Sequence, residues 1–271
     1  GSGGTTPTCV EPQDSLKYWW NQTPNHPVLP GEEFDEIDVL NRAQAHVQGV
    51  QQYGNTSDGI VGWSLGFVEP LLLQSFDANM PFNTVEFWVH TSAAESQLAL
   101  VYGQYRLIVD GGFVKLIFWD NGEENSTGPE TDGSYLLVSE TRVDDGKDHH
   151  IATTIETQGE GVETGSLRLF IDGEQEDELA LGDTVFAMHT VSQINGFIFG
   201  GNSGTLENKS FFTGHLDEIS LYDAALSASE IEGIFEAGSA GKCLPESEEP
   251  EGPQGPEGPQ GPQGPQGPSG Q

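Results

Sequence analysis

Two cysteines are the residues whose type and placement first indicate chemistry. Cys9 and Cys243 lie near the two ends of the part of the chain that reads as folded. In a reducing compartment they would be two unrelated thiols, whereas in an oxidising one they can join the two edges of a domain. Closing so long a loop restricts the unfolded chain by roughly 4–5 kcal/mol in the chain-entropy model. We favour the disulfide, which indicates an extracellular location and leaves neither cysteine as a nucleophile.

The adjacent pair His149-His150 looks like a metal site at first reading. The residues around it alternate as in a β-strand, and adjacent strand residues point to opposite faces of a sheet. No other cysteine or paired histidine has ligand spacing. The sequence therefore argues against a zinc site at this pair.

Aromatic side chains beside loops offer a second route to function, because sugar rings stack on the faces of Trp and Tyr. Trp119 is the first candidate, since Asp120-Asn121-Gly122 follows it and places it next to a loop. Asn202, which follows Gly200-Gly201, lies in another candidate loop. We predict Trp119, Asn121 and Asn202 as ligand-binding residues.

The charge of the chain excludes two classes of partner. The formal net charge is −34, with 43 acidic and 9 basic residues. Such a surface repels nucleic acid phosphates and anionic membranes. It suits a solvated surface in high salt, a cation-rich exterior or the binding of divalent metal ions. The sequence also contains no apolar run of about 18 residues, so we expect no membrane insertion.

Short alternating segments indicate an all-β fold. In residues 84–90, Val85, Phe87 and Val89 fall on one face of a strand. Strands of this kind with turn residues between them are typical of a two-sheet antiparallel jelly-roll sandwich. Asp172-Gly173 is a hairpin signal. We predict strands at 16–20, 84–90, 98–102, 105–109, 113–119, 149–155, 166–171, 196–199 and 214–222.

One short C-terminal helix is also predicted. Ser227 and Glu230 form a capping box, in which each side chain can bond to the backbone of the other residue. Ile231, Ile234 and Phe235 then form an apolar face, and a glycine at position 238 can end the helix.

The last residues have the period of collagen. Residues 252–271 contain six consecutive Gly-Pro-X triplets. Only glycine fits at the axis where three polyproline-II chains meet. The competing interpretation is a flexible linker, which Pro/Gly-rich stretches without a period usually are. The strict period favours the collagen interpretation and therefore a homotrimer.

These features divide the chain into four parts. Residues 1–8 have the composition of a linker or tag, and residues 9–243 form one all-β domain. An acidic linker spans 244–251, and the collagen-like repeat spans 252–271.

The segment from Gly214 to Ile231 resembles a known family. It matches the pattern G-x-[IL]-D-E-[VI]-x-[IL]-Y-x-x-A-L-S-x-x-E-I of laminin-G-like, concanavalin A-like jelly-roll domains, which are related to pentraxins. Weaker matches run in the expected order through residues 9–243: Cys9 with 18–20, 82–89, 148–152, 169–173, 199–202 and 241–243.

The resemblance implies a calcium site, because related domains often place a calcium-binding aspartate at the position of Asp217. Ca²⁺ takes six to eight oxygen ligands. We expect Asp38 and Asn41 to be the partners of Asp217. The competing interpretation is that Asp217 only accepts hydrogen bonds from the backbone.

The sequence departs from the family at two places. The segment 62–69 lacks the acids of the F-D-G-x-x-D-Y pattern, which weakens any metal or ligand site in the first half. The tryptophan that usually precedes the His-His pair is replaced by Asp148.

The sequence gives little support for an enzymatic function. Laminarinase-type glycoside hydrolases share the jelly roll and use E-[IL]-D-x-x-E, with two glutamates flanking the scissile bond. Residues 36–41 read Glu-Ile-Asp-Val-Leu-Asn, and the final Asn41 cannot act as an acid or a base. We therefore expect no catalysis.

The sequence as a whole indicates an extracellular, cell-surface or particle-surface head for adhesion or glycan recognition. Its partner would be a glycan or a cell-surface or matrix protein, bound by three heads at once. The alternative is a structural cap that nucleates the collagen helix and binds nothing. A head with two facing carboxylates in a cleft would instead be a glycan-active enzyme.

Overall fold

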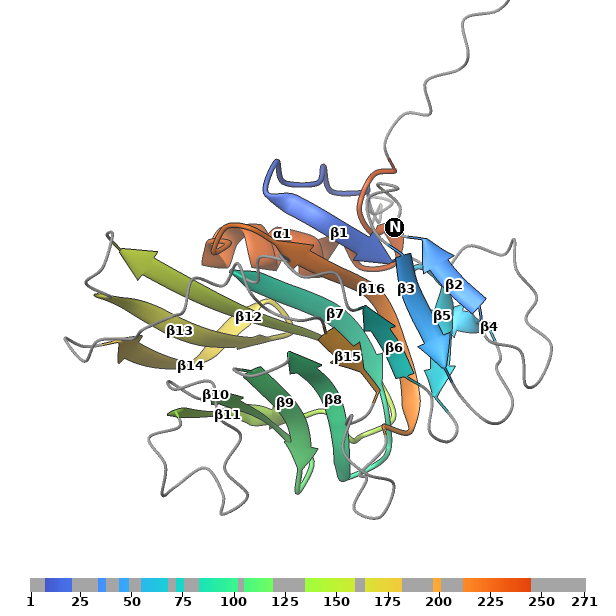
Figure 1. Cartoon of the computed structure of the whole chain (residues 1–271), viewed down its shortest axis with the longest axis horizontal. Coiled ribbons are helices and arrows are strands. Elements are labelled where there is room, and N and C mark those ends of the chain that lie inside the picture. The colour runs from blue at the N-terminus through green and yellow to red at the C-terminus, as the bar shows by residue number, and fades with distance from the viewer. Residues whose placement is uncertain are drawn as a thin grey trace, which may run out of the picture.

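The computed structural model describes residues 8–20, 34–37, 44–48, 55–67, 72–75, 83–101, 105–118, 135–158, 164–181, 197–200 and 212–244. These residues form two antiparallel β-sheets that face each other, with one short α-helix on the outside (Figure 1). The predicted jelly-roll sandwich is confirmed for this part of the chain. The collagen-like residues 252–271 and the linker residues 1–7 lie outside the described residues.

The first sheet contains most of the strands that the sequence predicted. β7 (Thr84–His90) lies near its centre, between the long strands β12 and β16. The order along the sheet is β14 (Glu174–Leu181), β13 (Thr164–Ile171), β12 (Asp148–Gln158), β7, β16 (Gly214–Tyr222), β5 (Gly62–Phe67) and β4 (Asn55–Gly59), and β1 (Leu16–Trp20) pairs with the second half of β16.

The second sheet faces the first across the core. Its order is β11 (Tyr135–Arg142), β10 (Phe113–Phe118), β9 (Tyr105–Asp110), β8 (Glu95–Val101), β15 (Phe197–Phe199), β6 (Leu72–Ser75), β3 (Gln44–Gln48) and β2 (Phe34–Ile37).

Alternation along the strands builds the core between the sheets. Val85, Phe87 and Val89 are each at most 2% exposed, as the period of two in β7 predicts. The rings of Phe87 in the first sheet and Phe199 in the second meet edge to face, with centroids 5.6 Å apart. This contact links the two layers at the centre of the sandwich.

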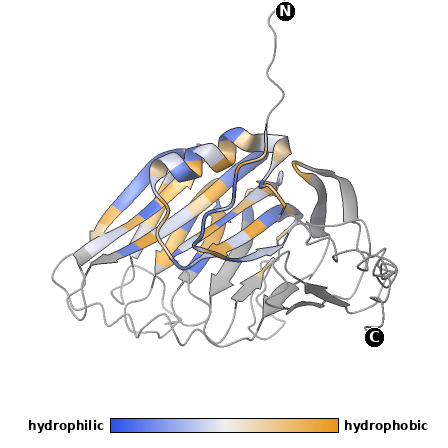
Figure 2. Ribbon diagram, turned by 90° about the horizontal axis from the view of Figure 1, so that it is seen from above, coloured by the Kyte–Doolittle hydropathy of each residue, from blue (hydrophilic) through white to orange (hydrophobic). Residues whose placement is uncertain are grey.

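A second apolar layer covers the outer face of the first sheet. The helix α1 (Ala228–Ala237) crosses this face, away from the second sheet (Figure 2). Its capping box is formed as predicted, and Gly238 is its C-cap. The short 3₁₀ helix η2 (Gly238–Ala240) follows α1. The layer is built from Leu16, Trp19, Ala152, Phe170, Tyr222, Leu226, Ile231 and Ile234.

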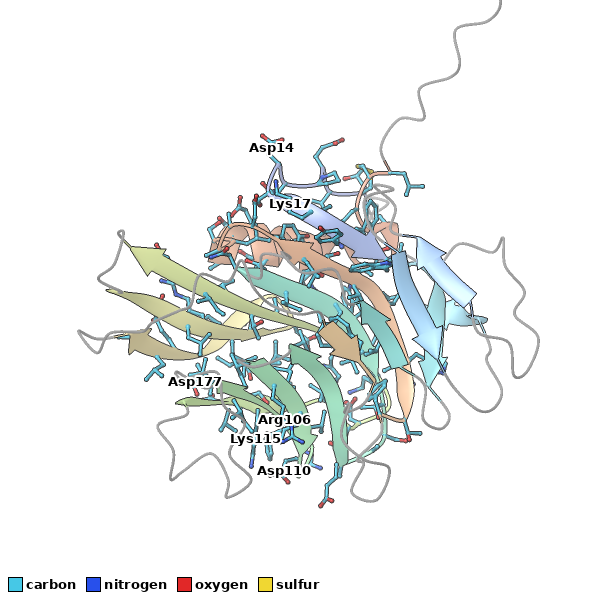
Figure 3. The ribbon with its side chains drawn as sticks, in the orientation of Figure 1. Asp14, Lys17, Arg106, Asp110, Lys115 and Asp177 are labelled. Carbon is cyan, nitrogen blue, oxygen red and sulfur yellow. A yellow bond between two sulfur atoms is a disulfide. The ribbon has the colours of Figure 1, made fainter. Side chains whose placement is uncertain are left out.

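Acidic side chains of β14 close one side of the sandwich. Oδ2 of Asp177, a residue labelled in Figure 3, accepts a hydrogen bond from the backbone N–H of Val138 at 2.9 Å. Oε2 of Glu176 accepts from the N–H groups of Glu140 and Thr141 at 2.7 and 3.0 Å. β11 is an edge strand, and exposed edge N–H groups invite pairing with another chain. Part of the negative charge of the chain therefore protects a sheet edge.

The strand directions give the sandwich two different ends. At the turn end, tight turns follow β7, β9 and β13. The predicted hairpin at Asp172-Gly173 is one of them, with φ angles of 52° and 81° that fit a type I′ turn. At the opposite end, which we call the loop end, the strands border the segments 102–104, 119–134, 159–163 and 182–196.

The two termini of the domain are fastened to each other. Cys9 and Cys243 form the predicted disulfide, with Cα atoms 4.9 Å apart. Val10 and Lys242 form a parallel β-bridge, in which the N–H of Val10 donates to Gly241 and the N–H of Cys243 donates to Val10. We call this group of residues, 9–10 and 241–243, the terminal clasp.

Candidate functional site

The three residues predicted to bind a ligand lie outside the described residues, but the strands before them are described. Trp119 and Asn121 follow the end of β10, and Asn202 follows β15 by three residues. β10 and β15 run in opposite directions in the same sheet. The strand end before Trp119 and Asn121 is therefore at the loop end, and the strand end before Asn202 is at the turn end.

Asp217, the predicted calcium ligand, lies in a β-bulge of β16. Between Asp217 and Ser220 the register against β7 shifts by one residue, and Glu218 has a φ angle of 55°. The bulge turns the consecutive side chains of Asp217 and Glu218 to the same outer face of the sheet. Oδ2 of Asp217 accepts from the N–H of Val61 at 3.0 Å, and Oδ1 accepts from the N–H of Glu218 at 2.8 Å.

The environment of Asp217 makes its charge costly. The residue is 4% exposed. Its pKa is raised to about 7, chiefly by burial and also by the neighbouring Glu218, while the N–H bond from Val61 opposes the rise. The expected partners Asp38 and Asn41 lie outside the described residues. Within the described part of the chain, no three His, Cys, Asp or Glu side chains gather in a metal-binding group.

Glu218 belongs to a buried cluster of charges beneath the terminal clasp. The Nζ of Lys242 lies 2.9 Å from Oε1 of Glu86 and 3.1 Å from Oε2 of Glu218. The same Oε2 accepts a hydrogen bond from Nε1 of Trp19 at 3.0 Å. Lys242 also lies over the Trp19 ring, 5.3 Å from its centroid. We call Glu86, Glu218 and Lys242 the buried triad.

Glu86 is the best-partnered member of the triad. Besides Lys242, its carboxylate contacts Nε2 of His150 at 3.0 Å and accepts from the hydroxyl of Tyr222 at 2.9 Å. Burial alone would raise the pKa of Glu86, but Lys242 and then His150 outweigh it and hold the pKa at about 2. Glu86 is therefore ionised at neutral pH.

The other two members respond to burial in opposite ways. Burial lowers the pKa of Lys242, but the carboxylates of Glu86 and Glu218 raise it above its usual value, so the ammonium stays charged. Burial raises the pKa of Glu218, whose Oε1 has no hydrogen-bond partner among the described residues. All three side chains are at most 4% exposed. A ligand in solution does not reach them, so we assign the triad a structural role.

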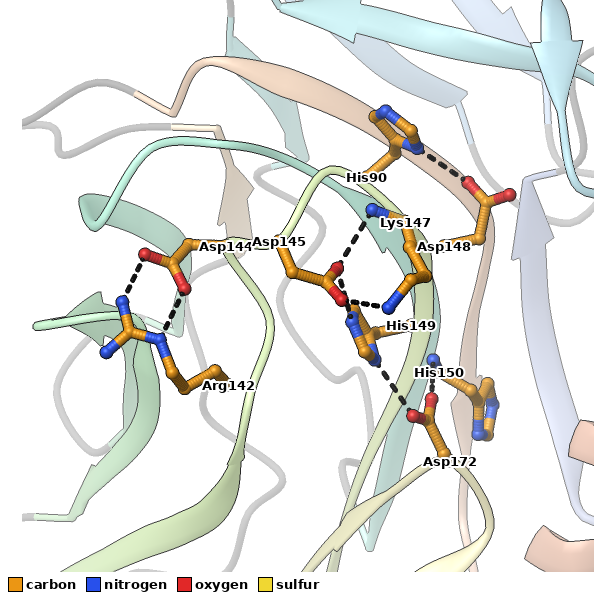
Figure 4. A network of polar contacts seen from close by, with 9 residues as sticks. All are labelled: His90, Arg142, Asp144, Asp145, Lys147, Asp148, His149, His150 and Asp172. Carbon is orange, nitrogen blue, oxygen red and sulfur yellow. Dashed lines mark hydrogen bonds and ion pairs between the residues drawn. The ribbon is translucent and has the colours of Figure 1, made fainter.

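A second polar network lies at the turn end (Figure 4). Asp172 accepts from the backbone N–H of His150 at 2.9 Å, and its other oxygen contacts Nδ1 of His149 at 2.8 Å. Asp145 contacts Nε2 of His149 at 3.1 Å and also pairs with Lys147. The bond to Asp172 and then the bond to Asp145 raise the pKa of His149, although burial opposes them. The network ties the β13–β14 turn to β12.

The sequence singled out none of the triad for chemistry, although one signal was available. In β7, Glu86 falls on the face opposite Val85 and Phe87, and Trp88 shares that face with it. A tryptophan on the supposedly solvated face indicates that this face is covered as well. The prediction that His149 and His150 point to opposite faces is confirmed. His150 is buried and contacts Glu86 on the outer face of the first sheet, whereas His149 contacts Asp172 in the turn-end network.

The sequence of residues 73–232 matches the laminin G family model described as the concanavalin A-like lectin/glucanases superfamily. The chain belongs to this family. The match covers more than half of the chain and includes β7, the turn-end network and the bulge at Asp217. A comparison with curated protein sequences gave no match. Among the described residues, no helix has the length and apolar composition to cross a bilayer.

Solved structures share the fold at low sequence identity. The botulinum neurotoxin type G receptor binding domain aligns with a TM-score of 0.54 at 12% identity, over 82% of this chain and 51% of that one. The binding domain of Paraclostridial Mosquitocidal Protein 1 aligns with a TM-score of 0.54 at 15% identity, over 82% and 52%.

A third solved structure carries a ligand. It is the botulinum neurotoxin serotype D ligand binding domain in complex with N-acetylneuraminic acid, with a TM-score of 0.54 at 14% identity, over 82% of this chain and 51% of that one. The present chain thus spans about half the length of the solved structures that it matches. At such identities the likeness shows the fold alone.

Removing the cation of the triad should strongly destabilise the domain. We expect Lys242→Met to lower the free energy of unfolding by about 3–5 kcal/mol, because it leaves two buried carboxylates without a counter-ion. The control Lys17→Met removes a surface pair with Asp223 of 2.8 Å and should cost at most about 1 kcal/mol. Urea unfolding followed by tryptophan fluorescence measures both. Equal costs for the two variants would show that the triad is not a strong determinant of stability.

Asp217 should make stability fall as pH rises. Its pKa of about 7 in the folded state lies above the ordinary value of 3.8, so between these two values the folded state binds the proton more tightly. Its stabilising contribution is therefore complete below about pH 4 and is lost by about pH 7, a change on the order of 2–4 kcal/mol.

A carboxyl carbon NMR titration measures this pKa directly, with the resonance assigned by Asp217→Asn. That variant should also flatten the slope of unfolding free energy against pH, whereas the exposed control Asp223→Asn should not. The test compares slopes and not stabilities at one pH. Asparagine cannot accept both N–H bonds, so the variant also loses stability for a reason unrelated to titration. A titration midpoint near 4 would contradict the assignment.

Proposed function

We propose that this chain is an extracellular head for adhesion or glycan recognition, displayed as a trimer on a collagen-like stalk. The observation that carries the proposal is a sandwich of the concanavalin A-like lectin superfamily followed by an unbroken Gly-Pro-X period at 252–271. The serotype D neurotoxin domain, which has the same fold, is known with N-acetylneuraminic acid bound. Fold alone does not decide function, so the proposal depends on the loops and the tail together.

The proposed ligand site is at the loop end of the sandwich. Trp119 and Asn121 follow β10 there, and the strands bordering 102–104 and 182–196 end at the same side. An aromatic face stacks on the apolar face of a sugar ring, while an amide bonds to its hydroxyl groups. Asn202 would contribute to a separate contact at the turn end.

The charge of the chain selects among glycans. A net charge of −34 repels anionic sugars at long range. We therefore propose a neutral glycan as the ligand, or a neutral patch on a cell-surface or matrix protein. The same field works against nucleic acids and anionic membranes as partners.

We also propose that Ca²⁺ binds at Asp217, with Asp38 and Asn41 as partners, and stabilises the head without contacting the ligand. The pKa of the buried Asp217 carboxyl is raised to about 7. A bound cation can take the place of the proton and neutralise the carboxylate. The proposed calcium is therefore structural.

Trimerisation supplies affinity that a single head lacks. Three heads on one stalk can raise weak affinities by roughly 10²–10⁴ through effective concentration. The disulfide of the terminal clasp fits an oxidising location, such as the extracellular space or the surface of a cell, virus or spore. We propose no catalytic role.

A structural cap is the alternative, and one observation favours it. The chain leaves the domain toward the tail at Lys242 and Cys243. Cys243 is bonded to Cys9 near the N-terminus, and Lys242 belongs to the buried triad. A rigid exit of this kind could set the register of three collagen chains without any ligand.

A glycan array tests the two functions against each other. The head, fused to a strong trimerising stalk, is probed in Ca²⁺ and again in EDTA. We expect binding to a class of neutral glycans, reduced at least tenfold by Trp119→Ala and unchanged by the control Asn125→Ala in the same segment. Absence of binding by a folded trimer in both buffers would reject glycan recognition and leave the cap.

A further inference from the structure

His149 lies between two carboxylates that come from different parts of the turn end (Figure 4). Its Nδ1 is 2.8 Å from Oδ2 of Asp172, in the turn between β13 and β14, and its Nε2 is 3.1 Å from Oδ1 of Asp145. Asp145 belongs to segment 143–147, which crosses from β11 in the second sheet to β12 in the first. We propose that His149 is a pH-sensitive switch, which holds segment 143–147 while its ring is doubly protonated and releases it when the ring loses one proton.

The geometry requires a charged ring to make both contacts. A neutral imidazole has one N–H donor and one lone pair, whereas an imidazolium has two N–H donors. An ionised carboxylate only accepts hydrogen bonds, so a neutral ring can donate to Asp172 or to Asp145 but not to both. His149 is 7% exposed, so water has little access to the ring. Both contacts are therefore present only while His149 is an imidazolium.

The partners of the two carboxylates decide which contact is lost. Oδ1 of Asp172 accepts from the backbone N–H of His150 at 2.9 Å, and the backbone N–H of Asp172 donates to the His150 carbonyl at 2.8 Å. Asp145 has Lys147 as a second partner, through the backbone N–H at 3.0 Å and through the ammonium group. We expect the remaining proton to stay on Nδ1, toward Asp172. The lone pair on Nε2 then repels Asp145.

Segment 143–147 connects the two sheets at the turn end. The backbone N–H of Val143 donates to Gly112, in the turn between β9 and β10, at 2.9 Å. The backbone N–H of Gly146 donates to Thr91, which follows β7, at 3.0 Å. Release of Asp145 would therefore loosen the link between the second sheet and the end of β7. It would leave the β13–β14 turn in place, because Asp172 keeps its bonds to β12.

The charged groups around His149 fix the direction of the response. The bond to Asp172 and then the bond to Asp145 raise the pKa of His149 above its ordinary value of 6.5, while burial opposes them. The contacts therefore stabilise the folded state fully below pH 6.5, and this contribution is lost as the pH rises through the raised pKa. Lys147 is the cation that faces the same site, and its charge is paired with Asp145.

The other charged neighbours are paired away from the ring. Arg142 and Asp144, in the approach to the same segment, bond to each other at 2.7 and 3.0 Å. Asp148, the preceding residue of β12, contacts His90 at 3.0 Å. On β7 the residue paired with His149 is the apolar Val89. The carboxylates that contact the ring are thus those of the switch itself.

NMR of the ring nitrogens of His149, in the whole chain, tests the protonation step. We expect a titration midpoint above 6.5, with Nε2 and not Nδ1 losing its proton. Asp145→Asn should lower the midpoint, because it removes one of the two carboxylates. The matched control Asp110→Asn removes a half-exposed carboxylate that pairs with Lys115 at the same end, and it should leave the midpoint unchanged.

Amide hydrogen exchange of the parent on both sides of that midpoint tests the release. Expressed as protection factors, exchange at Gly146 should lose protection by about threefold or more, the scale of one partly exposed ion pair. The amide of Asp172, which bonds to His150, should keep its protection and serves as the internal reference. In Asp145→Asn the protection of Gly146 should not change across the midpoint.

Three results would overturn the proposal. The first is a His149 midpoint at or below 6.5, and the second is loss of the proton from Nδ1 instead of Nε2. The third is a Gly146 protection factor that stays constant across the midpoint, or that changes only in step with that of Asp172. The last outcome would mean that the whole domain loosens and that segment 143–147 is not released on its own.

Discussion

The ammonium group of Lys242, held between the carboxylates of Glu86 and Glu218, is the interaction on which the outer layer of this domain depends. Each partner comes from a different part of the chain: the central strand β7, the bulge of β16 and the segment next to Cys243. Charges so deeply buried are costly unless every one is paired. The bulge at Glu218, the ring of Trp19 and the hydroxyl of Tyr222 complete the pairing. The sheet, the helix layer and the terminal clasp can therefore reach their native arrangement only together.

This arrangement couples the exit of the chain to the centre of the fold. The disulfide fixes Cys243 to Cys9, and Lys242, the residue before Cys243, extends its side chain into the triad. The chain at residue 243 is thereby joined to the first sheet through the disulfide and the triad. The two ends of the sandwich then have different roles. The turn end is tightened by polar networks around His149 and His90, and the loop end borders segment 119–134, in which we propose that Trp119 and Asn121 bind a ligand.

Local patterns predicted the elements whose sequences carry their own signal. The capping box at Ser227, the type I′ turn at Asp172 and the alternation around Phe87 each depend on a few consecutive residues. Strands such as β3 and β4 are short and polar, so no period of two marks them, and pairing with β6 and β5 defines them instead. The partners within the triad and the His90–Asp148 pair could not be predicted, because their members lie far apart in sequence and are brought together only by the fold. The predicted ligand residues Trp119, Asn121 and Asn202, and the predicted calcium partners Asp38 and Asn41, remain predictions.

The coupling between clasp, triad and sheet is the central claim, and native-state hydrogen exchange tests it most directly. Amide exchange in β7 and β16 is measured in the oxidised chain and after reduction of the Cys9–Cys243 disulfide under native conditions. If the clasp holds Lys242 in the triad, reduction should accelerate exchange at Glu86, Trp88 and Ser220, although all three lie well away from the disulfide in sequence. Exchange that increases only at residues 8–12 and 241–244, with β7 and β16 unchanged, would contradict the account.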